Sequence, residues 1–186
     1  QLQVVGEKAG VKVFEMGQQG KHLNSIHVSH EKHTAACATE IMAIPETVCI
    51  SMSQHIGAPC KPLVAKGDAV KVGQVIGDTD AFVSAPIHSS VSGTVKDIIT
   101  MRNVMGGKDQ MVVIEADGKQ EVWEEIKPPV INDMKDFIAA MRASGLVGLG
   151  GASFPTHIKL NPKNLDEVET LIVNAAECEP FITSDH

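Results

Sequence analysis

Two neighbouring motifs hold the residues most suited to chemistry: Gly148-Leu-Gly-Gly-Ala-Ser-Phe-Pro-Thr-His-Ile-Lys159 and Asn174-Ala-Ala-Glu-Cys-Glu-Pro180. Three glycines, Gly148, Gly150 and Gly151, fall within four positions of the first motif. Glycine has no Cβ, so this stretch of backbone can be approached closely by a large ligand. The first motif therefore predicts a ligand-binding loop.

The residues after the glycines favour an anionic ligand. We expect a helix to start near Pro155 or Thr156, within 154–160, and its free N–H groups and dipole would then favour a phosphate. Lys159 would add a positive charge one turn inside that helix. His157 is a further candidate for contact with the phosphate.

The second motif supplies polar groups for the rest of a ligand. A strand-like run, Thr170-Leu-Ile-Val-Asn174, delivers the Asn174 amide and leads to the carboxylates of Glu177 and Glu179. Such groups suit a polar ring system or a ribose. The alternative is an ordinary Gly-rich turn before a helix, with the two carboxylates capping a turn.

The two motifs together carry a family resemblance. G-x-G-G-A-x-F-P-T-x-x-K with N-x-x-E-x-E-P resembles the FMN site of the NADH-oxidising flavoprotein subunit of respiratory complex I. The form with Cys178, followed by Thr183-Ser-Asp185, is more similar to the C subunit of the Rnf electron-transport complex. Ser53-Gln-His-Ile-Gly-Ala-Pro-Cys60 and Phe82-Val-Ser-Ala-Pro-Ile-His-Ser-Ser-Val-Ser-Gly93 extend the likeness, which covers roughly residues 45–186.

The resemblance implies roles for individual residues. By position in the motifs, those expected to bind FMN and NAD(H) are Gly148, Gly150, Gly151, Phe154, Lys159, Asn174, Glu177 and Glu179. Among them, Asn174 and Glu177 would contact the flavin, and Phe154 and Glu179 would face NADH. The complex I pattern has Arg, Gly and Asp where this chain has Leu149, Ser153 and Ala176, so the Arg and Asp roles do not transfer. No side chain is expected to act as a catalytic acid or base.

The implied function is that of an electron-entry or electron-exit subunit of a membrane-associated NAD:ferredoxin oxidoreductase. Electrons would pass between NADH, FMN and 4Fe-4S clusters to drive ion translocation by partner subunits, with this subunit peripheral at the cytoplasmic face of the membrane. The chain begins with Gln1 and ends six residues after Pro180, so we expect a fragment that is inactive alone. The alternatives are a soluble flavoprotein reductase of related fold (cobalamin-reductase-like, or a partner in amino-acid reduction) and a non-catalytic docking module.

Composition excludes several other classes. Sixteen basic residues against 23 acidic give a net charge of −7, and with one Trp and no Tyr this argues against a nucleic-acid partner. No run approaches the ~20 apolar residues of a membrane span. The four cysteines (Cys37, Cys49, Cys60 and Cys178) form no C-x-x-C, so the sequence predicts free thiols in a reducing compartment, without a cluster or zinc ribbon of its own.

The elements that must position the site divide into three parts. We expect a histidine-rich arm over 1–45, a barrel-sandwich hybrid over 46–127, and the truncated start of an α/β FMN/NADH-binding domain over 128–186. The overall fold class is therefore α+β or α/β, with an all-β N-terminal module. Strands are predicted at 11–14, 47–52, 75–76, 82–83, 93–95, 110–115 and 170–174.

The β module resembles the lipoyl and biotinyl carriers through Val64-Ala-Lys-Gly-Asp-Ala-Val-Lys-Val-Gly-Gln-Val-Ile-Gly77. A carrier needs a lysine on the hairpin that follows, because its prosthetic group is attached through an amide. Here the hairpin reads Asp78-Thr-Asp-Ala-Phe-Val-Ser84, and no lysine occurs between Lys71 and Lys96. The module is therefore predicted to be a scaffold.

A helix is predicted between the scaffold and the glycine loop. Lys127-Pro-Pro129 marks a linker, and apolar residues at helical spacing follow it within 132–145. Asn132 can cap the start of the helix, and Gly145 can close its end.

Other chemistry-bearing residues have weaker signals. A cluster of His22, His27, His30 and His33, with Cys37 four residues on, has ligands that zinc prefers, but a solvated histidine-rich arm is the favoured interpretation and no metal is predicted. His55, Cys60 and His88 are expected to serve packing or contact with the flavin domain, since their spacing does not place them within hydrogen-bond reach.

Overall fold

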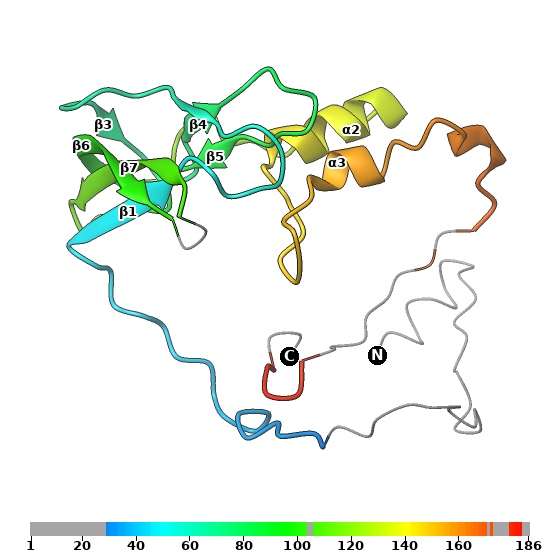
Figure 1. Cartoon of the computed structure of the whole chain (residues 1–186), viewed down its shortest axis with the longest axis horizontal. Helices are drawn as coiled ribbons and strands as arrows, with labels where there is room; N and C mark the ends of the chain where they lie inside the picture. Colours follow the sequence, from blue (N-terminus) through cyan, green and yellow to red (C-terminus); the bar gives the residue numbers. More distant parts are fainter. Residues whose placement is uncertain (1–28, 104–105, 171, 173–178, 184–186) are drawn as a thin grey trace. The chain divides into compact units, whose positions relative to one another are not determined.

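The structure, a computed structural model, describes residues 29–103, 106–170, 172 and 179–183. The predicted strand at 11–14 lies outside these residues. The described residues belong to two units: one spans Glu40–Ile172, and the other holds residues 29–39 and 179–183 (Figure 1). The larger unit contains all the strands and helices described below.

Seven strands of the larger unit form two antiparallel sheets. The four-stranded sheet has the order β1 (Thr47–Ser51), β7 (Lys108–Ala116), β6 (Gly93–Arg102) and β3 (Ala69–Val70). The three-stranded sheet has the order β2 (Lys61–Pro62), β4 (Val75–Asp78) and β5 (Ile87–His88). This is the all-β module that the short strands and their Gly turns predict.

An apolar core lies between the sheets, because alternate residues of the long strands turn inward. Val95 on β6 pairs with Ile114 on β7, and both side chains are almost completely buried. Ile98 packs against the same core opposite the fully buried Val112, after a bulge that shifts the β6 register. The buried cluster consists of Ile50, Met52, Cys60, Val70, Ile76, Ile87, Val91, Val95, Val112 and Ile114.

The strands predicted at 47–52, 75–76, 93–95 and 110–115 are confirmed, but the one at 82–83 is wrong. Phe82 and Val83 belong to the loop between β4 and β5, and the Phe82 side chain is 82% exposed. The Ser84 hydroxyl donates to the carbonyls of Ala81 (2.6 Å) and Thr79 (3.2 Å), so this segment closes on itself instead of joining a ladder. The strand that follows β4 and pairs with it is β5, at Ile87–His88, and β2 pairs with the other edge of β4.

The predicted helix is α2 (Met134–Ala143), and its first cap differs from the prediction. Asp133, not Asn132, is the N-cap, because its carboxylate accepts from the Asp136 amide at 2.8 Å. Asn132 instead donates to the Asp136 carboxylate. Gly145 follows the helix with φ at +70°, as predicted for a closing glycine.

Two short helices follow: α3 (Thr156–Lys159), where a helix is predicted to start after the glycines, and the 3-10 turn η1 (Leu165–Glu167). α2 and α3 pack together beside the part of the β module that holds β4 and β5 (Figure 1). Of the strand predicted at 170–174, residues 170 and 172 are in no strand and the rest lie outside the described residues. Within the described part of the chain, no helix is long and apolar enough to cross a membrane.

The two-sheet core predicts the effect of a cavity at its centre. Ile114→Ala should lower the free energy of unfolding by about 2–4 kcal/mol, because Ile114 is fully buried between the sheets. Urea denaturation measures this loss. As a control, Ile41→Ala should change stability by less than about 0.5 kcal/mol, because Ile41 is 97% exposed. Equal effects of the two substitutions would contradict the placement of Ile114 in a packed core.

Candidate functional site

The glycine loop is a short excursion closed at its base by backbone hydrogen bonds. The Thr156 amide donates to the Leu146 carbonyl at 3.0 Å, and the Gly148 amide donates to the Phe154 carbonyl at 3.0 Å. Between these bonds, Val147 and Pro155 form an antiparallel bridge. The base of the loop is therefore fixed, and residues 149–153 project from it.

The structure brings Lys159 to this loop, as the sequence predicts. A Cβ added at Gly148 would lie 3.2 Å from the Lys159 Nζ atom. Gly150 and Gly151 are exposed, and a Cβ at either position would have no protein atom within 4 Å. A cationic amine thus lies beside a bare, open stretch of backbone. Leu149, where the complex I pattern has Arg, is 90% exposed.

Ser153 is in a conformation that favours glycine. Its φ is +51°, in the left-handed region that costs L residues roughly 1 kcal/mol. The complex I pattern has glycine at this position, so the sequence departure coincides with a strained residue. The Ser153 carbonyl also accepts from the Ile56 amide of the β module at 3.4 Å.

His157 is buried, so it is not on the exposed surface of the loop. Its Nδ1 atom is buried without a hydrogen-bond partner. Burial, with a smaller contribution from the positive charge of Arg142, lowers the pKa of the His157 imidazole. The ring is therefore neutral at pH 7 and brings no positive charge to a phosphate.

The second motif is only partly described. Asn174 and Glu177 lie outside the described residues, whereas Glu179 is described and exposed. Lys32 of the N-terminal arm donates through Nζ to the carbonyls of Glu179, at 2.5 Å, and Ile182. The Glu31 amide donates to the Pro180 carbonyl at 3.0 Å, so the arm and the end of the second motif are joined. No sequence motif signals this pairing.

The histidine cluster does not assemble a metal site among the described residues. His33 Nε2 lies 3.1 Å from a Glu31 carboxylate oxygen, and both side chains are exposed. His22 and His27 lie outside the described residues.

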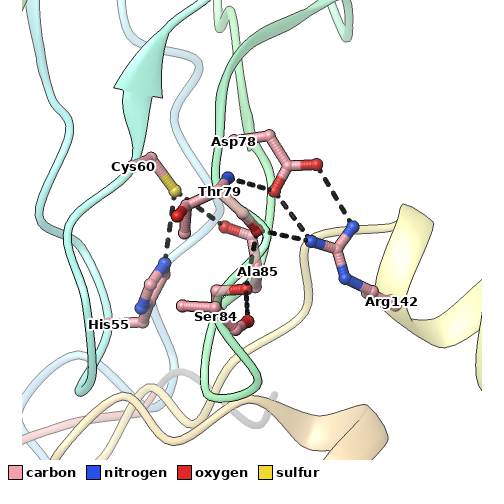
Figure 2. Close-up of polar contacts among 8 residues, drawn as sticks. His55, Cys60, Asp78, Thr79, Ser84, Ala85 and Arg142 are labelled. Atoms are coloured by element: carbon pink, nitrogen blue, oxygen red, sulfur yellow. Dashed lines mark hydrogen bonds and ion pairs between the residues drawn. The ribbon is translucent and has the colours of Figure 1, made fainter.

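A polar junction links the β module to the helix that precedes the loop (Figure 2). Arg142, in the last turn of α2, donates to both carboxylate oxygens of Asp78 at 2.8 and 3.2 Å. It also donates to the Thr79 carbonyl at 3.1 Å. A bidentate pair with a third bond fixes the orientation of the planar guanidinium, which a single contact would not.

The charge state of this junction follows from its surroundings. Burial disfavours ionisation of Asp78, but hydrogen bonds from Arg142 and the Thr79 amide outweigh it and lower the pKa of the carboxyl. A lowered pKa means that the ionised carboxylate stabilises the fold above its ordinary pKa near 4 and that this contribution is lost as pH falls through the lowered value. At neutral pH the pair contributes about 1 kcal/mol, since both side chains are partly exposed.

Behind the junction, His55 and Cys60 are in contact, which their spacing did not predict. His55 Nε2 lies 3.4 Å from Cys60 Sγ, and the thiol donates to the Ala85 carbonyl at 3.3 Å (Figure 2). Burial raises the pKa of the Cys60 thiol, the Asp78 carboxylate raises it further, and Arg142 opposes the rise. The Cys60 thiol is therefore protonated at pH 7 and is not an activated nucleophile.

Comparison with known proteins agrees with this architecture. Residues 21–119 match the RnfC barrel sandwich hybrid domain, and residues 141–186, which begin in α2 and include the glycine loop, match the Nuo51 FMN-binding domain. The β module with its appended loop is thus a barrel-sandwich hybrid followed by the start of an FMN-binding domain.

The relatives of this chain are C subunits of ion-translocating oxidoreductase complexes. The chain is 48% identical, over 84% of its length, to the C subunit of the proton-translocating ferredoxin:NAD(+) oxidoreductase complex of Clostridium ljungdahlii. It is 43% identical, over 91% of its length, to the Na(+)-translocating counterpart of Acetobacterium woodii, and 36% identical, over 86%, to the C subunit of the ion-translocating oxidoreductase complex of Rhodobacter capsulatus. The alignments cover 35%, 39% and 32% of these relatives. The chain belongs to the RnfC family.

The strain at Ser153 predicts a stabilising substitution. Ser153→Gly should raise the free energy of unfolding by about 0.5–1 kcal/mol, because glycine adopts positive φ freely although it gains more entropy in the unfolded chain. Thermal and urea denaturation measure the change. Ser144→Gly, at a residue with φ of −68°, is the control and should not stabilise. Destabilisation by Ser153→Gly would contradict the positive φ.

The buried thiol predicts selective protection from alkylation. Cys60 is 3% exposed with a raised pKa, so iodoacetamide at pH 8 should label it at least about tenfold more slowly than the exposed Cys37 and Cys49. Peptide mass spectrometry over a time course resolves the three sites. In concentrated urea the rates should converge. If Cys60 of the folded protein were labelled as fast as Cys49, the buried position of Cys60 would be contradicted.

Proposed function

We propose that the glycine loop binds FMN, with its backbone and Lys159 facing the anionic part of the cofactor. The observation that supports this most strongly is the conformation of Gly150 and Gly151. Neither has a positive φ, and neither would place a Cβ against any protein atom. The packing of the chain therefore gives no reason for glycine at these positions, whereas a molecule that lies against the backbone does.

Gly145 illustrates the other reason for a glycine. It has φ at +70°, and a Cβ there would lie 2.6 Å from the Pro86 carbonyl oxygen. The fold itself therefore requires Gly145. Two glycines that the fold does not require, in a loop whose base holds the Lys159 amine, fit a cradle for a large anionic ligand.

Further residues of the proposed site are assigned by the family resemblance. Gly148 keeps space for the Lys159 amine, and Phe154 and Glu179 would face NAD(H). Asn174 and Glu177 would contact the flavin. FMN, when bound, supplies the conversion between hydride transfer and single-electron transfer. The chain's part in this proposal is to bind and orient the cofactor, and no side chain is assigned proton transfer.

At the level of the whole protein, we propose an electron-entry or electron-exit subunit of a membrane-associated ferredoxin:NAD oxidoreductase. The names of the relatives in Clostridium ljungdahlii and Acetobacterium woodii support this. The partners would be NADH, ferredoxin and the other subunits, at the cytoplasmic face of the membrane. The chain has no C-x-x-C, so 4Fe-4S clusters would be held by residues other than these, and the 186 residues alone would not turn over NADH.

The role of the glycine loop in FMN binding can be tested with substitutions that do not disturb the fold. In the protein made from the complete reading frame, Gly151→Val should weaken FMN binding at least about tenfold, a loss of about 1.4 kcal/mol, because the added side chain meets the ligand and no protein atom. Lys159→Met should weaken it by a similar amount through the lost charge. Quenching of flavin fluorescence during titration measures both.

Two controls make the result specific. Lys163→Met removes an exposed lysine four residues beyond Lys159 and should leave FMN affinity unchanged. Melting temperatures should be equal for all variants, since Gly151 and Lys159 are both exposed. Unchanged FMN affinity in Gly151→Val and Lys159→Met, or no FMN binding by the unsubstituted protein, would contradict the proposed function.

A further inference from the structure

We propose that Arg142 is a positioning residue, through which the Asp78–Ser84 hairpin of the β module holds the glycine loop in place. The proposal concerns how the loop is held, and its consequence for FMN rests on the proposed function. The proposal gives a role to this hairpin, which lacks the lysine that a lipoyl or biotinyl carrier would have there.

Few contacts hold α2 on the β module. No residue of this helix is buried, so apolar packing alone holds it weakly. Its polar contacts with the β module are the three-bond junction of Arg142 with Asp78 and Thr79 (Figure 2) and a single bond from the His88 ring to the Ala143 carbonyl. A helix with a half-exposed apolar face needs such a polar anchor to keep one orientation.

Only a few residues of chain separate Arg142 from the base of the glycine loop. Gly145, three residues on, is pressed against the β module, where an added Cβ would lie 2.6 Å from the Pro86 carbonyl oxygen and 3.0 Å from the His88 ring. The Leu146 carbonyl then accepts from Thr156, and Gly148 closes the base of the loop. If α2 changed its orientation after loss of the Arg142 contacts, the change would therefore be transmitted to Gly148, only six residues along the chain.

The Asp78–Ser84 hairpin is itself held by internal hydrogen bonds. The Asp78 carboxylate accepts from the Thr79 amide at 2.8 Å, and Ser84 bonds the carbonyls of Thr79 and Ala81. The Ala85 carbonyl is held by the buried Cys60 thiol. The acceptors of Arg142 are thus held by hydrogen bonds within the β module that do not involve α2.

A small hollow shows that the contact is not a continuous apolar interface. It measures 180 Å³ and lies between the β module and the segment after α2, with Gln54, His55, His88, Gly145 and Val147 among its lining. Contact there is incomplete, so the orientation of the segment depends on the polar junction beside it. Removal of that junction would leave this segment attached by the close contact at Gly145 and by two single hydrogen bonds, from His88 to Ala143 and from Ile56 to Ser153.

The experiment compares variants of Arg142 in the full-length protein by amide hydrogen exchange. Arg142→Met should raise exchange of the Gly148 and Thr156 amides at least about tenfold, while amides of β6 and β7 stay unchanged. Arg142→Lys keeps the charge but loses the bidentate geometry, so it should give an intermediate increase. The exchanged pair Asp78→Arg with Arg142→Asp should restore part of the protection, because it re-forms the ion pair but not the two hydrogen bonds with Thr79.

The control is a second ion pair on the β module. Glu124→Gln removes the 2.9 Å pair with Lys71, which does not involve α2, and should leave exchange at the loop base unchanged. In FMN titrations, Arg142→Met should weaken binding about tenfold, and the exchanged pair should recover part of the affinity.

Exchange at Gly148 and Thr156 that is the same in Arg142→Met and the unsubstituted protein would overturn the proposal, and so would an equal effect of Glu124→Gln. The exchange measurement needs no flavin. It therefore decides the role of Arg142 even when the unsubstituted protein fails to bind FMN, a failure that would contradict only the proposed function.

Discussion

One guanidinium group is the main polar anchor of the segment that leads into the glycine loop. Arg142 joins a helix with no buried residue to a hairpin that the core of the β module makes rigid. The three hydrogen bonds are directional, so they fix orientation as well as distance. The lowered pKa of Asp78 keeps the junction ionised throughout the neutral range. A carrier-like scaffold is thereby used to hold a neighbouring loop, and the hairpin that would display a prosthetic group faces a helix instead.

The fold could be predicted where its causes are local. Runs of β-branched residues between Gly turns mark most of the strands, and helical spacing with a closing Gly145 marks α2. The errors arose where side chains compete for the backbone. Ser84 folds the segment at Phe82 into a loop, and Asp133 takes the cap that Asn132 was expected to form. Such choices depend on geometry that residue types alone do not specify.

The site could be predicted only along one continuous motif. The glycines and Lys159 are brought together because they flank the same short loop. The junction of Arg142 with Asp78 joins residues 64 positions apart, and Lys32 reaches Glu179 across 147 positions. Hydrogen-bond partners at such separations leave no periodic signal in a single sequence. The departure from the family pattern at Ser153 was visible in the sequence, but its cost appears only in the backbone conformation.

The central claim is that this loop belongs to a flavin site that exchanges electrons with NADH. The most direct test is the anaerobic visible absorption spectrum of the protein from its complete reading frame, recorded before and after addition of NADH. The expected result is a protein with flavin and iron–sulfur absorbance that bleaches when NADH is added. A protein that stays colourless after reconstitution with FMN and iron would contradict it and would leave the β module as a docking scaffold.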